Sequence, residues 1–280
     1  MLIAQISDIH VGSARFRPDL LRIAIEEINA AEPDLVVVAG DITDDGYGDQ
    51  YPEAQAALAM LACESMVLVP GNHDARNVGD VRFEDTFGSR DSRHRMQLGG
   101  LDVAIVAVDS SKPDLDEGQI GREHYAWIAE GFAGAADLRV FVCHHHLVAI
   151  PGTGRDRNQL MDAGDVLALL RDCRNDIVLS GHRHVPYLWP IAGMYLIHSG
   201  TVSTTRTRGF PDSAYNLVRV ADEQIEVELR VPGGVRHSLG RYPRNWPEAL
   251  TAREADPFTR FSRGGPLASP GGPSTGIPSP

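Results

Sequence analysis

The stretch Val67-Leu68-Val69-Pro70-Gly71-Asn72-His73-Asp74 joins an apolar run to a polar loop. The apolar residues predict a buried β-strand, and Pro70-Gly71 predicts its end. An amide, an imidazole and a carboxylate then follow in immediate succession. Taken alone, this pattern also fits an ordinary turn, because short polar residues are common in turns. Its meaning depends on how the other predicted strands of the chain end.

Four more apolar runs lead directly into Asp or His. These are Ile6-Ser7 before Asp8 and His10, Val38-Ala39-Gly40 before Asp41, Val142-Cys143 before His144, His145 and His146, and Leu179-Ser180-Gly181 before His182 and His184. Each has an ordinary explanation, such as a helix cap for an Asp or a solvated loop for three histidines. Seven of the eleven histidines lie at these five strand ends, however, so the ordinary explanation fails for the set.

The apolar periodicity predicts an α/β fold in which strands alternate with helices, so that neighbouring strands pair in parallel. The expected strands are 2–6, 35–39, 66–69, 139–143 and 177–179, and the expected helices are 18–31, 50–62, 120–132 and 163–173. Residues 81–98 predict a short helix and a loop, followed by a hairpin between 95–98 and 101–108. Strands at 187–191, 194–198, 215–220 and 225–231 are expected to finish the sheet as an antiparallel meander. The two halves together predict a two-sheet sandwich of mixed sheets flanked by helices.

The division of the chain follows its composition. Residues 1–231 are expected to form one domain, and residues 232–262 a C-terminal extension. Residues 263–280 are rich in Gly, Pro and Ser, which predicts a disordered tail.

The bulk composition weighs against several classes of protein. A formal net charge of −12 gives no general attraction for phosphate backbones, so a nucleic acid polymer is not the expected partner. Three widely spaced cysteines do not predict a disulfide framework. The N-terminus lacks the basic region of a signal peptide, and no apolar run is long enough to span a bilayer. The expected location is the cytoplasm, without membrane association.

The polar residues at the strand ends predict a metal site. The carboxyl ends of parallel strands lie along one edge of a sheet, so residues far apart in the chain can meet there. Asp, His and Asn without Cys form an oxygen and nitrogen ligand set, which suits Mn, Fe, Zn or Co. Seven candidate ligands are too many for one ion and suit two ions if a carboxylate bridges them. Two such ions can polarise a phosphoryl group and template in-line attack, which predicts phosphoester hydrolysis.

The ordered motifs Asp8-x-His10, Gly40-Asp41-x-x-Asp44, Gly71-Asn72-His73-Asp74, His144 and Gly181-His182-x-His184 resemble those of the calcineurin-like metallophosphoesterases. The resemblance covers residues 1–200 and implies an αββα sandwich with a dinuclear metal centre. Within this family, the sequence is similar to the bacterial and archaeal branch that contains cyclic-nucleotide and glycerophosphodiester phosphodiesterases.

The resemblance also implies roles for individual residues. One ion would be held by Asp8, His10, Asp41 and His184, and the other by Asp41, Asn72, His144 and His182, so that Asp41 bridges. His73 would face the leaving-group oxygen as a general acid or hydrogen-bond donor, and Asp74 would orient His73. Asp44 either supports the site or caps the next helix.

Several assignments stay open at this point. His144 is chosen over its neighbours because it comes first after the strand, with His145 expected on the opposite side and His146 as the alternative ligand or a substrate contact. Arg155, Arg157 and Arg206 are candidate substrate contacts, because guanidinium groups bind phosphate oxygens in pairs. His198 is interpreted as a core histidine or a supporting residue.

The expected function is hydrolysis of small phosphodiesters or cyclic nucleotides through in-line attack by a metal-bound hydroxide. A phosphomonoesterase is the first alternative, followed by a nuclease and a scaffold that has lost its chemistry. The expected cofactors are two divalent or trivalent metal ions per subunit, the expected partner is a small phosphoester, and a homodimer is left open.

Overall fold

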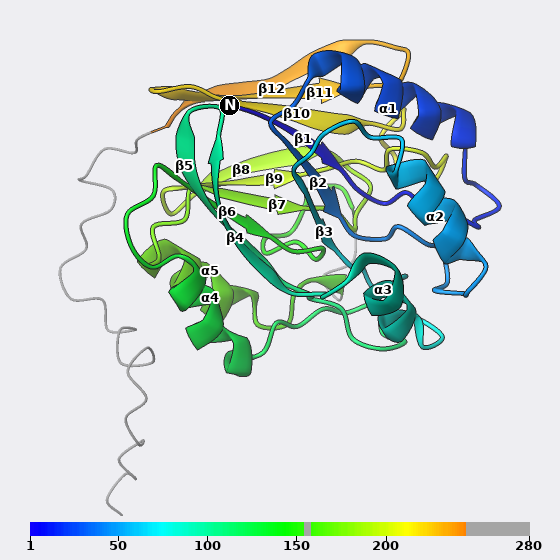
Figure 1. Cartoon of the computed structure of the whole chain (residues 1–280), viewed down its shortest axis with the longest axis horizontal. Coiled ribbons are helices and arrows are strands. Elements are labelled where there is room, and N and C mark those ends of the chain that lie inside the picture. Colours follow the sequence, from blue (N-terminus) through cyan, green and yellow to red (C-terminus); the bar gives the residue numbers. More distant parts are fainter. Residues whose placement is uncertain (154–157, 245–280) are drawn as a thin grey trace, which may run out of the picture.

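The structure is a computed structural model that describes residues 1–153 and 158–244. In these ranges the chain forms two six-stranded sheets that lie face to face, with helices on both outer sides (Figure 1). The predicted two-sheet α/β sandwich is therefore confirmed.

The first sheet has the strand order β12-β11-β10-β1-β2-β3. Its members are β1 (Leu2–Ile6), β2 (Leu35–Ala39), β3 (Met66–Val69), β10 (Tyr215–Val220), β11 (Gln224–Arg230) and β12 (Arg236–Pro243). β1, β2 and β3 pair in parallel, as their alternation with helices predicts, whereas β10, β11 and β12 continue the sheet antiparallel.

The second sheet has the order β4-β5-β6-β7-β9-β8. Its members are β4 (Ser92–Leu98), β5 (Leu101–Ala107), β6 (Leu138–Val142), β7 (Ile177–Ser180), β8 (Tyr187–Ile191) and β9 (Met194–His198). The four central strands are parallel, and β4 and β8 form antiparallel edges.

The helices form the outer layers of the sandwich (Figure 1). They are α1 (Pro18–Ala31), α2 (Gln50–Leu58), α3 (Gly79–Phe87), α4 (Tyr125–Gly131) and α5 (Ala163–Asp172), with a 3-10 turn at Arg122–His124 before α4. α1, α2 and α3 share a buried cluster with the outer face of the first sheet, and α4 and α5 share one with the second. None of these described helices combines the length and apolar character that a bilayer span requires.

The inner faces of the two sheets share a third apolar cluster. Ile3 and Val37 of the first sheet pack there with Val103, Val140 and Ile177 of the second, and all five side chains are buried. Strands that are buried on both faces carry nearly continuous apolar sequence. This explains why the chain shows apolar runs rather than alternation before its polar strand ends.

Four boundary predictions differ from the structure. α2 ends at Leu58 instead of residue 62, because the following residues tighten into turns. The segment predicted as a loop before residue 95 already belongs to β4. Gly121, with φ of 89°, delays the start of the predicted helix at 120, which opens as a 3-10 turn. β12 was not predicted, and it lies within the segment 232–262 that the sequence suggests is an extension.

The prediction of one antiparallel meander over residues 187–231 is wrong. β8 and β9 complete the second sheet, whereas β10 and β11 extend the first sheet from β1. Apolar periodicity identifies the strands but does not specify which sheet each strand joins. The predicted tail at 263–280 lies outside the described residues.

A buried amide ties the two sheets together near their carboxyl edge. Gln5 Nε2 donates to the carbonyls of Ser180 and Ile197, at 2.9 and 3.2 Å. Gln5 Oε1 accepts from Asn216 Nδ2 at 3.0 Å. One side chain of β1 thus satisfies groups of β7, β9 and β10.

We expect Gln5→Leu to destabilise the fold by about 1–3 kcal/mol, because buried polar groups would lose their partners. Equilibrium unfolding in urea measures this change. Gln55→Leu is the matched control, since Gln55 is exposed and makes a single contact with Thr86; its effect should stay within about 0.5 kcal/mol. Equal midpoints for the two variants would contradict the role of Gln5.

Candidate metal centre

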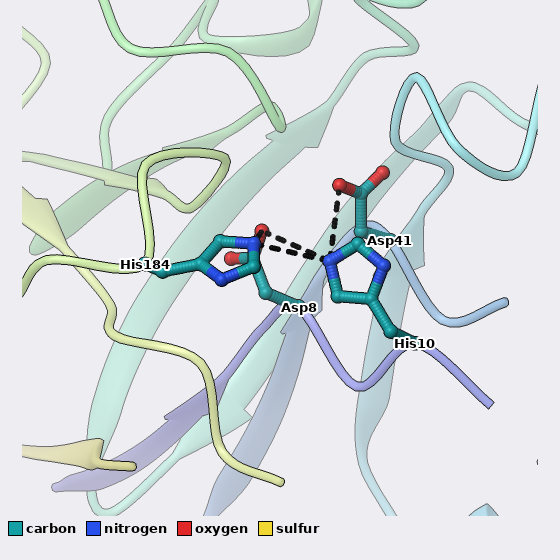
Figure 2. Close-up of side chains that lie close together, drawn as sticks. All are labelled: Asp8, His10, Asp41 and His184. Carbon is teal, nitrogen blue, oxygen red and sulfur yellow. Dashed lines mark hydrogen bonds and ion pairs between the residues drawn. The ribbon is translucent and has the colours of Figure 1, made fainter. Parts of the chain in front are cut away.

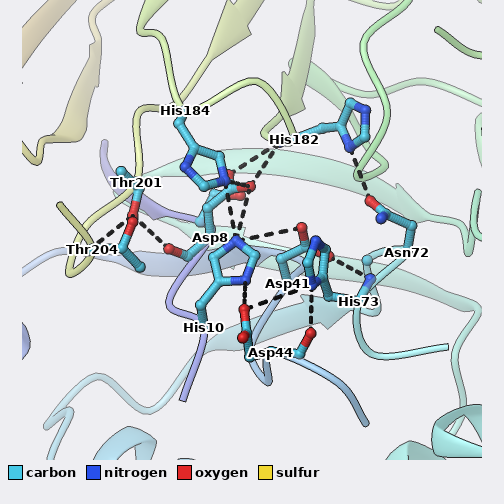
Figure 3. Close-up of polar contacts among 12 residues, drawn as sticks. Asp8, His10, Asp41, Asp44, Asn72, His73, His182, His184, Thr201 and Thr204 are labelled. Carbon is cyan, nitrogen blue, oxygen red and sulfur yellow. Dashed lines mark hydrogen bonds and ion pairs between the residues drawn. The ribbon is translucent and has the colours of Figure 1, made fainter. Parts of the chain in front are cut away.

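The loops after β1, β2, β3 and β7 meet at one edge of the sandwich, as the strand-end pattern predicts (Figure 3). The loop after β6 joins them there through His144. Glycines allow the close approach. A Cβ on Gly71 would lie 2.2 Å from Asp41 Oδ1, and one on Gly40 would lie 2.5 Å from His144 Nδ1. Gly40 and Gly71, which precede Asp41 and Asn72, are therefore steric requirements of the site.

The first ligand cluster consists of Asp8, His10, Asp41 and His184 (Figure 2). All four residues are buried, and one candidate ligand atom from each lies within 4.8 Å of the others. His184 Nε2 is 3.2 Å from Asp8 Oδ1, and His10 Nε2 is 3.6 Å from Asp41 Oδ2. This is the set predicted for one ion.

The second ligand cluster consists of Asp41, His144 and His182, with Asn72 beside them. His144 Nε2 lies 3.3 Å from Asp41 Oδ2 and 3.3 Å from Asn72 Oδ1. Asn72 Oδ1 is also 2.9 Å from His182 Nδ1. The structure thus brings all seven predicted ligands together, and Asp41 belongs to both clusters.

Most of these residues have an unusual backbone conformation. Asp8, His10, Asp41, His182 and His184 all have positive φ, between 53° and 75°. Left-handed backbone is uncommon for residues other than glycine and often marks functional loops. The fold therefore accepts local strain to turn these side chains toward one point.

The hydrogen bonds of the imidazoles show that the first cluster suits a cation. His184 Nδ1 donates to the carbonyl of Arg206, which can only accept, so the lone pair of a neutral ring lies on Nε2. His10 Nδ1 contacts Asp44 Oδ1 at 3.0 Å, which directs its Nε2 inward in the same way. The two Nε2 atoms face each other at 3.1 Å beside two carboxylates. Such a concentration of electron pairs fits a metal ion.

The second cluster has the same character. His144 Nδ1 donates to the carbonyl of Ala39 at 2.7 Å and so directs Nε2 toward Asp41. Burial alone would lower the pKa of His144, but Asp41 and then Asp8 outweigh burial and raise the pKa to about 9. The position therefore favours a positive charge, which a metal ion bound to Nε2 would supply.

His73 lies at the rim of the first cluster, where it forms a separate group of candidate ligand atoms with His10 and Asp44. Its backbone N–H donates to Asp41 Oδ1 at 2.9 Å, and its ring meets the ring of His10 edge-on, with centroids 4.5 Å apart. Its Nδ1 contacts the carbonyl of Asp44 and lies 3.7 Å from the Asp44 carboxylate and 3.0 Å from Arg76 Nη1. The contacts through Nδ1 leave Nε2 available to a substrate.

The expected role of Asp74 is wrong in one respect, because its carboxylate does not orient His73. It accepts hydrogen bonds from the backbone of Gly71, Ile42 and Thr43, at 2.8, 3.1 and 2.7 Å. Burial and then repulsion from Asp41 raise the pKa of Asp74 to about 6, and the backbone donors oppose this shift. Asp74 therefore fixes the loops that carry Asp41 and Asn72.

Asp44 takes the supporting role that the sequence left open. It contacts His10 and His73, while the residue that precedes α2 at the N-cap position is Asp49. A cap role for Asp44 is therefore excluded. A carboxylate behind a ligating imidazole orients the ring and raises its basicity.

Asp116 is a site residue that sequence reasoning missed. Its Oδ1 accepts from Asn72 Nδ2 at 3.3 Å and from Arg76 Nη2 at 2.8 Å. This contact fixes the amide of Asn72 so that Oδ1 faces the second cluster. No signal in the sequence could have found Asp116, because it lies in an irregular acidic loop rather than at a strand end.

The histidines that follow His144 lie outside both ligand clusters. His145 uses its ring nitrogens on Ser110 Oγ, at 2.8 Å, and on the carbonyl of Asp116, at 3.2 Å. His146 stacks on His182 with centroids 5.7 Å apart, and its buried Nδ1 has no partner among the described residues. Neither belongs to any of the three groups of candidate ligand atoms found among the described residues, which favours His144 as the ligand.

The remaining predicted residues have different outcomes. Arg155 and Arg157 lie outside the described residues. Arg206 is at the site through its backbone carbonyl, and its side chain is exposed. His198 is fully buried, with Nδ1 2.6 Å from Ser180 Oγ, as a core histidine would be.

A surface hollow lies far from this chemistry. It has a volume of about 580 Å³ and is lined by residues 221–224 and 241–243. These residues follow β10 at the amino-terminal end of β1, so they lie at the opposite edge of the first sheet from the ligands. The hollow presents no convergent set of ligand atoms.

Comparison with known proteins agrees with this geometry. The model of the calcineurin-like phosphoesterase family matches residues 1–186. The chain belongs to this family and is a metal-dependent phosphoester hydrolase.

Two relatives with similar sequences are named as phosphodiesterases. A probable cyclic nucleotide phosphodiesterase from Rhodococcus erythropolis is 28% identical over 236 residues, which cover 76% of this chain and 74% of that protein. A probable glycerophosphodiester phosphodiesterase from Arcobacter nitrofigilis is 28% identical over 156 residues, which cover 52% of this chain and 57% of that protein.

Solved structures share the fold. A dimetal phosphatase from Danio rerio superposes with a TM-score of 0.64 at 15% identity, covering 85% of this chain and 98% of that one. GAP50, the anchor in the inner membrane complex of Plasmodium, has a TM-score of 0.66 at 15% identity and covers 100% of this chain and 99% of that one.

We expect Asn72→Ala to remove one ion, because the second cluster loses an oxygen ligand while the first keeps all four of its own. Asp116→Ala should weaken binding of the same ion by about 10–100-fold, since it frees the amide without removing it. Titration calorimetry with Mn, together with metal analysis, measures both effects.

The matched control is Asp114→Ala. Asp114 lies on the same loop but accepts from the backbone of Asn77 instead of from a ligand. Metal affinity should not change in this variant. If Asn72→Ala keeps two ions at wild-type affinity, the assignment of Asn72 as a ligand is refuted.

Proposed function

We propose that this protein is a phosphodiesterase that hydrolyses small phosphodiesters, including cyclic nucleotides, with two metal ions. The observation that carries the proposal is the position of Asp41, whose carboxylate lies in both ligand clusters. A carboxylate shared by two ligand sets is what a dinuclear centre requires. The preference for diesters is supported by relatives named as phosphodiesterases.

The structure suggests which residues would hold each ion. The first ion would be held by Asp8, His10, Asp41 and His184, and the second by Asp41, Asn72, His144 and His182. The donors are oxygen and nitrogen atoms without thiolates, which suits Mn, Fe, Zn or Co. When bound, such a pair polarises the phosphoryl group and activates a water for in-line attack.

His73 would serve the leaving group. Its Nδ1 contacts Asp44, so a protonated ring would present an Nε2–H toward the ester oxygen that departs. A protonated imidazole can deliver a proton to an alkoxide as it forms. Asp44 contacts both His73 and His10, and these contacts would fix the position of the His73 ring relative to the first ligand cluster.

The charge of the protein favours a small substrate. A net charge of −12 repels a nucleic acid polymer, so the site would select a small phosphoester by its metals and local cations. Arg206, Arg155, Arg157 and His146 remain proposed substrate contacts. A phosphomonoesterase is the alternative activity, and the cytoplasmic location and the homodimer remain predictions.

An assay with two model esters tests the proposal. We expect the Mn-loaded full chain to hydrolyse bis-p-nitrophenyl phosphate faster than p-nitrophenyl phosphate, and a chelator to abolish both activities, with recovery on addition of Mn. A faster reaction with the monoester would favour the phosphatase. Absence of turnover of either ester with two ions bound would contradict the proposed activity on simple diesters.

His73→Ala should keep both ions, because His73 is in neither ligand cluster. We expect the rate to fall by about 10²–10⁴-fold for a diester with an alkyl leaving group. The loss should be smaller for bis-p-nitrophenyl phosphate, whose leaving group needs no proton. Steady-state kinetics on both esters checks this difference, and equal losses would refute the general-acid role.

A further inference from the structure

The loop between β9 and β10 is held against the first ligand cluster (Figure 3). Thr201 Oγ1 donates to the carbonyl of Asp8 at 2.6 Å and lies 3.0 Å from Thr204 Oγ1. Two residues further on, the carbonyl of Arg206 accepts from His184 Nδ1. The loop thus contacts Asp8 and His184 of this cluster. The residues that follow Arg206 therefore start from a position beside the metal centre.

Two arginines follow at this point, and Arg208 is the unusual one. Its φ of 49° is left-handed, and the turn is closed by a hydrogen bond from Phe210 N to the carbonyl of Thr207, at 3.0 Å. Its side chain is half-buried, and its Nε is fully buried without a hydrogen-bond partner. Among the described residues, no carboxylate forms an ion pair with Arg206 or Arg208.

The charges around Arg208 are those of the metal centre. Burial, followed by repulsion from Arg206 and Arg183, lowers the pKa of Arg208, and attraction to Asp8 and Asp41 acts in the opposite direction. Its guanidinium is therefore within electrostatic reach of the carboxylates of the first ligand cluster. Metal ions bound to those carboxylates would cancel their attraction for Arg208 and add positive charge.

A half-buried cation in these surroundings needs an anion. Burial of an unpaired charge is costly, and several cations together increase the cost. A phosphoester held at the metal centre supplies non-bridging oxygens, and a guanidinium binds such oxygens through two parallel N–H groups. Among the cations of this loop, Arg208 has the most to gain, because its buried Nε lacks a partner.

We propose that Arg208 binds a non-bridging oxygen of the substrate phosphoryl group and positions that group over the metal centre. The inference deepens the proposed function and rests on it for the identity of the ligand. Arg208 would supply charge and hydrogen bonds, and the proton for the leaving group would still come from His73.

The test measures binding of inorganic phosphate to the Mn-loaded full chain by titration calorimetry. We expect Arg208→Gln to raise the Kd for phosphate roughly tenfold or more, because a charged hydrogen bond is lost. Arg208→Lys should recover part of the affinity, since it keeps the charge but not the paired N–H groups. With bis-p-nitrophenyl phosphate, KM should rise by a larger factor than kcat falls.

Arg22→Gln is the control for net charge. It removes one positive charge from an exposed pair with Glu26 on α1, and it should leave the Kd for phosphate unchanged. An unchanged Kd in Arg208→Gln would overturn the proposal. Loss of metal in both Arg208 variants would also overturn it, because Arg208 would then support the metal centre rather than the substrate.

The measurement separates this inference from the proposed function, since phosphate binding requires no turnover. A wild-type protein that hydrolyses neither model ester, yet loses phosphate affinity on Arg208→Gln, would refute the function and retain the anion contact. If the wild-type protein hydrolyses a model ester but Arg208→Gln binds phosphate with an unchanged Kd, the function would be retained and the anion contact refuted.

Discussion

The convergence of imidazoles from both sheets on the carboxylate of Asp41 is the constraint on which the site depends. His10 follows β1 of the first sheet and lies 3.6 Å from Asp41 Oδ2, whereas His144 follows β6 of the second and lies 3.3 Å away. One carboxylate therefore couples the two halves of the sandwich. Because these groups are buried, their mutual charges are weakly screened, and a cation between them would stabilise the carboxyl edge of both sheets.

This interaction constrains the backbone around it. Asp41 can reach both clusters only because Gly71 leaves room for its carboxylate and Asp74 holds its loop through backbone N–H groups. The left-handed residues at the site are tolerated for the same reason, since neighbouring hydrogen bonds determine the conformation of the loops. Gln5 extends the constraint inward by joining β1 to β7 and β9. Rigid sheets thus place the ligands, and short loops carry them.

The extent of what the sequence could predict follows from the same physics. Apolar runs that end in Asp, Asn or His mark both the buried strands and the edge where they terminate, so the convergence of these side chains could be predicted before the structure. The assignment of the last strands to the two sheets could not be predicted. β9 and β10 both read as apolar strands, and nothing in the local sequence of β10 specifies its partner β1. The role of Asp74 was misassigned for a related reason. Adjacency to His73 in sequence suggests a contact, but the turn directs the carboxylate to backbone donors instead.

Asp116 shows a further limit, since it lies on an irregular loop whose course is set by contacts made elsewhere. The pairing of cations near the site explains why an acidic chain can still favour a small anion. Arg76 is neutralised by Asp45 and Asp116, at 3.3 and 2.8 Å, so it adds little positive field. Arg206 and Arg208 have no such partners among the described residues. The positive charge of Arg206 and Arg208 therefore lies on one loop beside the candidate ligands, where it would favour a single phosphate group. A polymer would require a continuous stripe of such charges to outweigh the net repulsion.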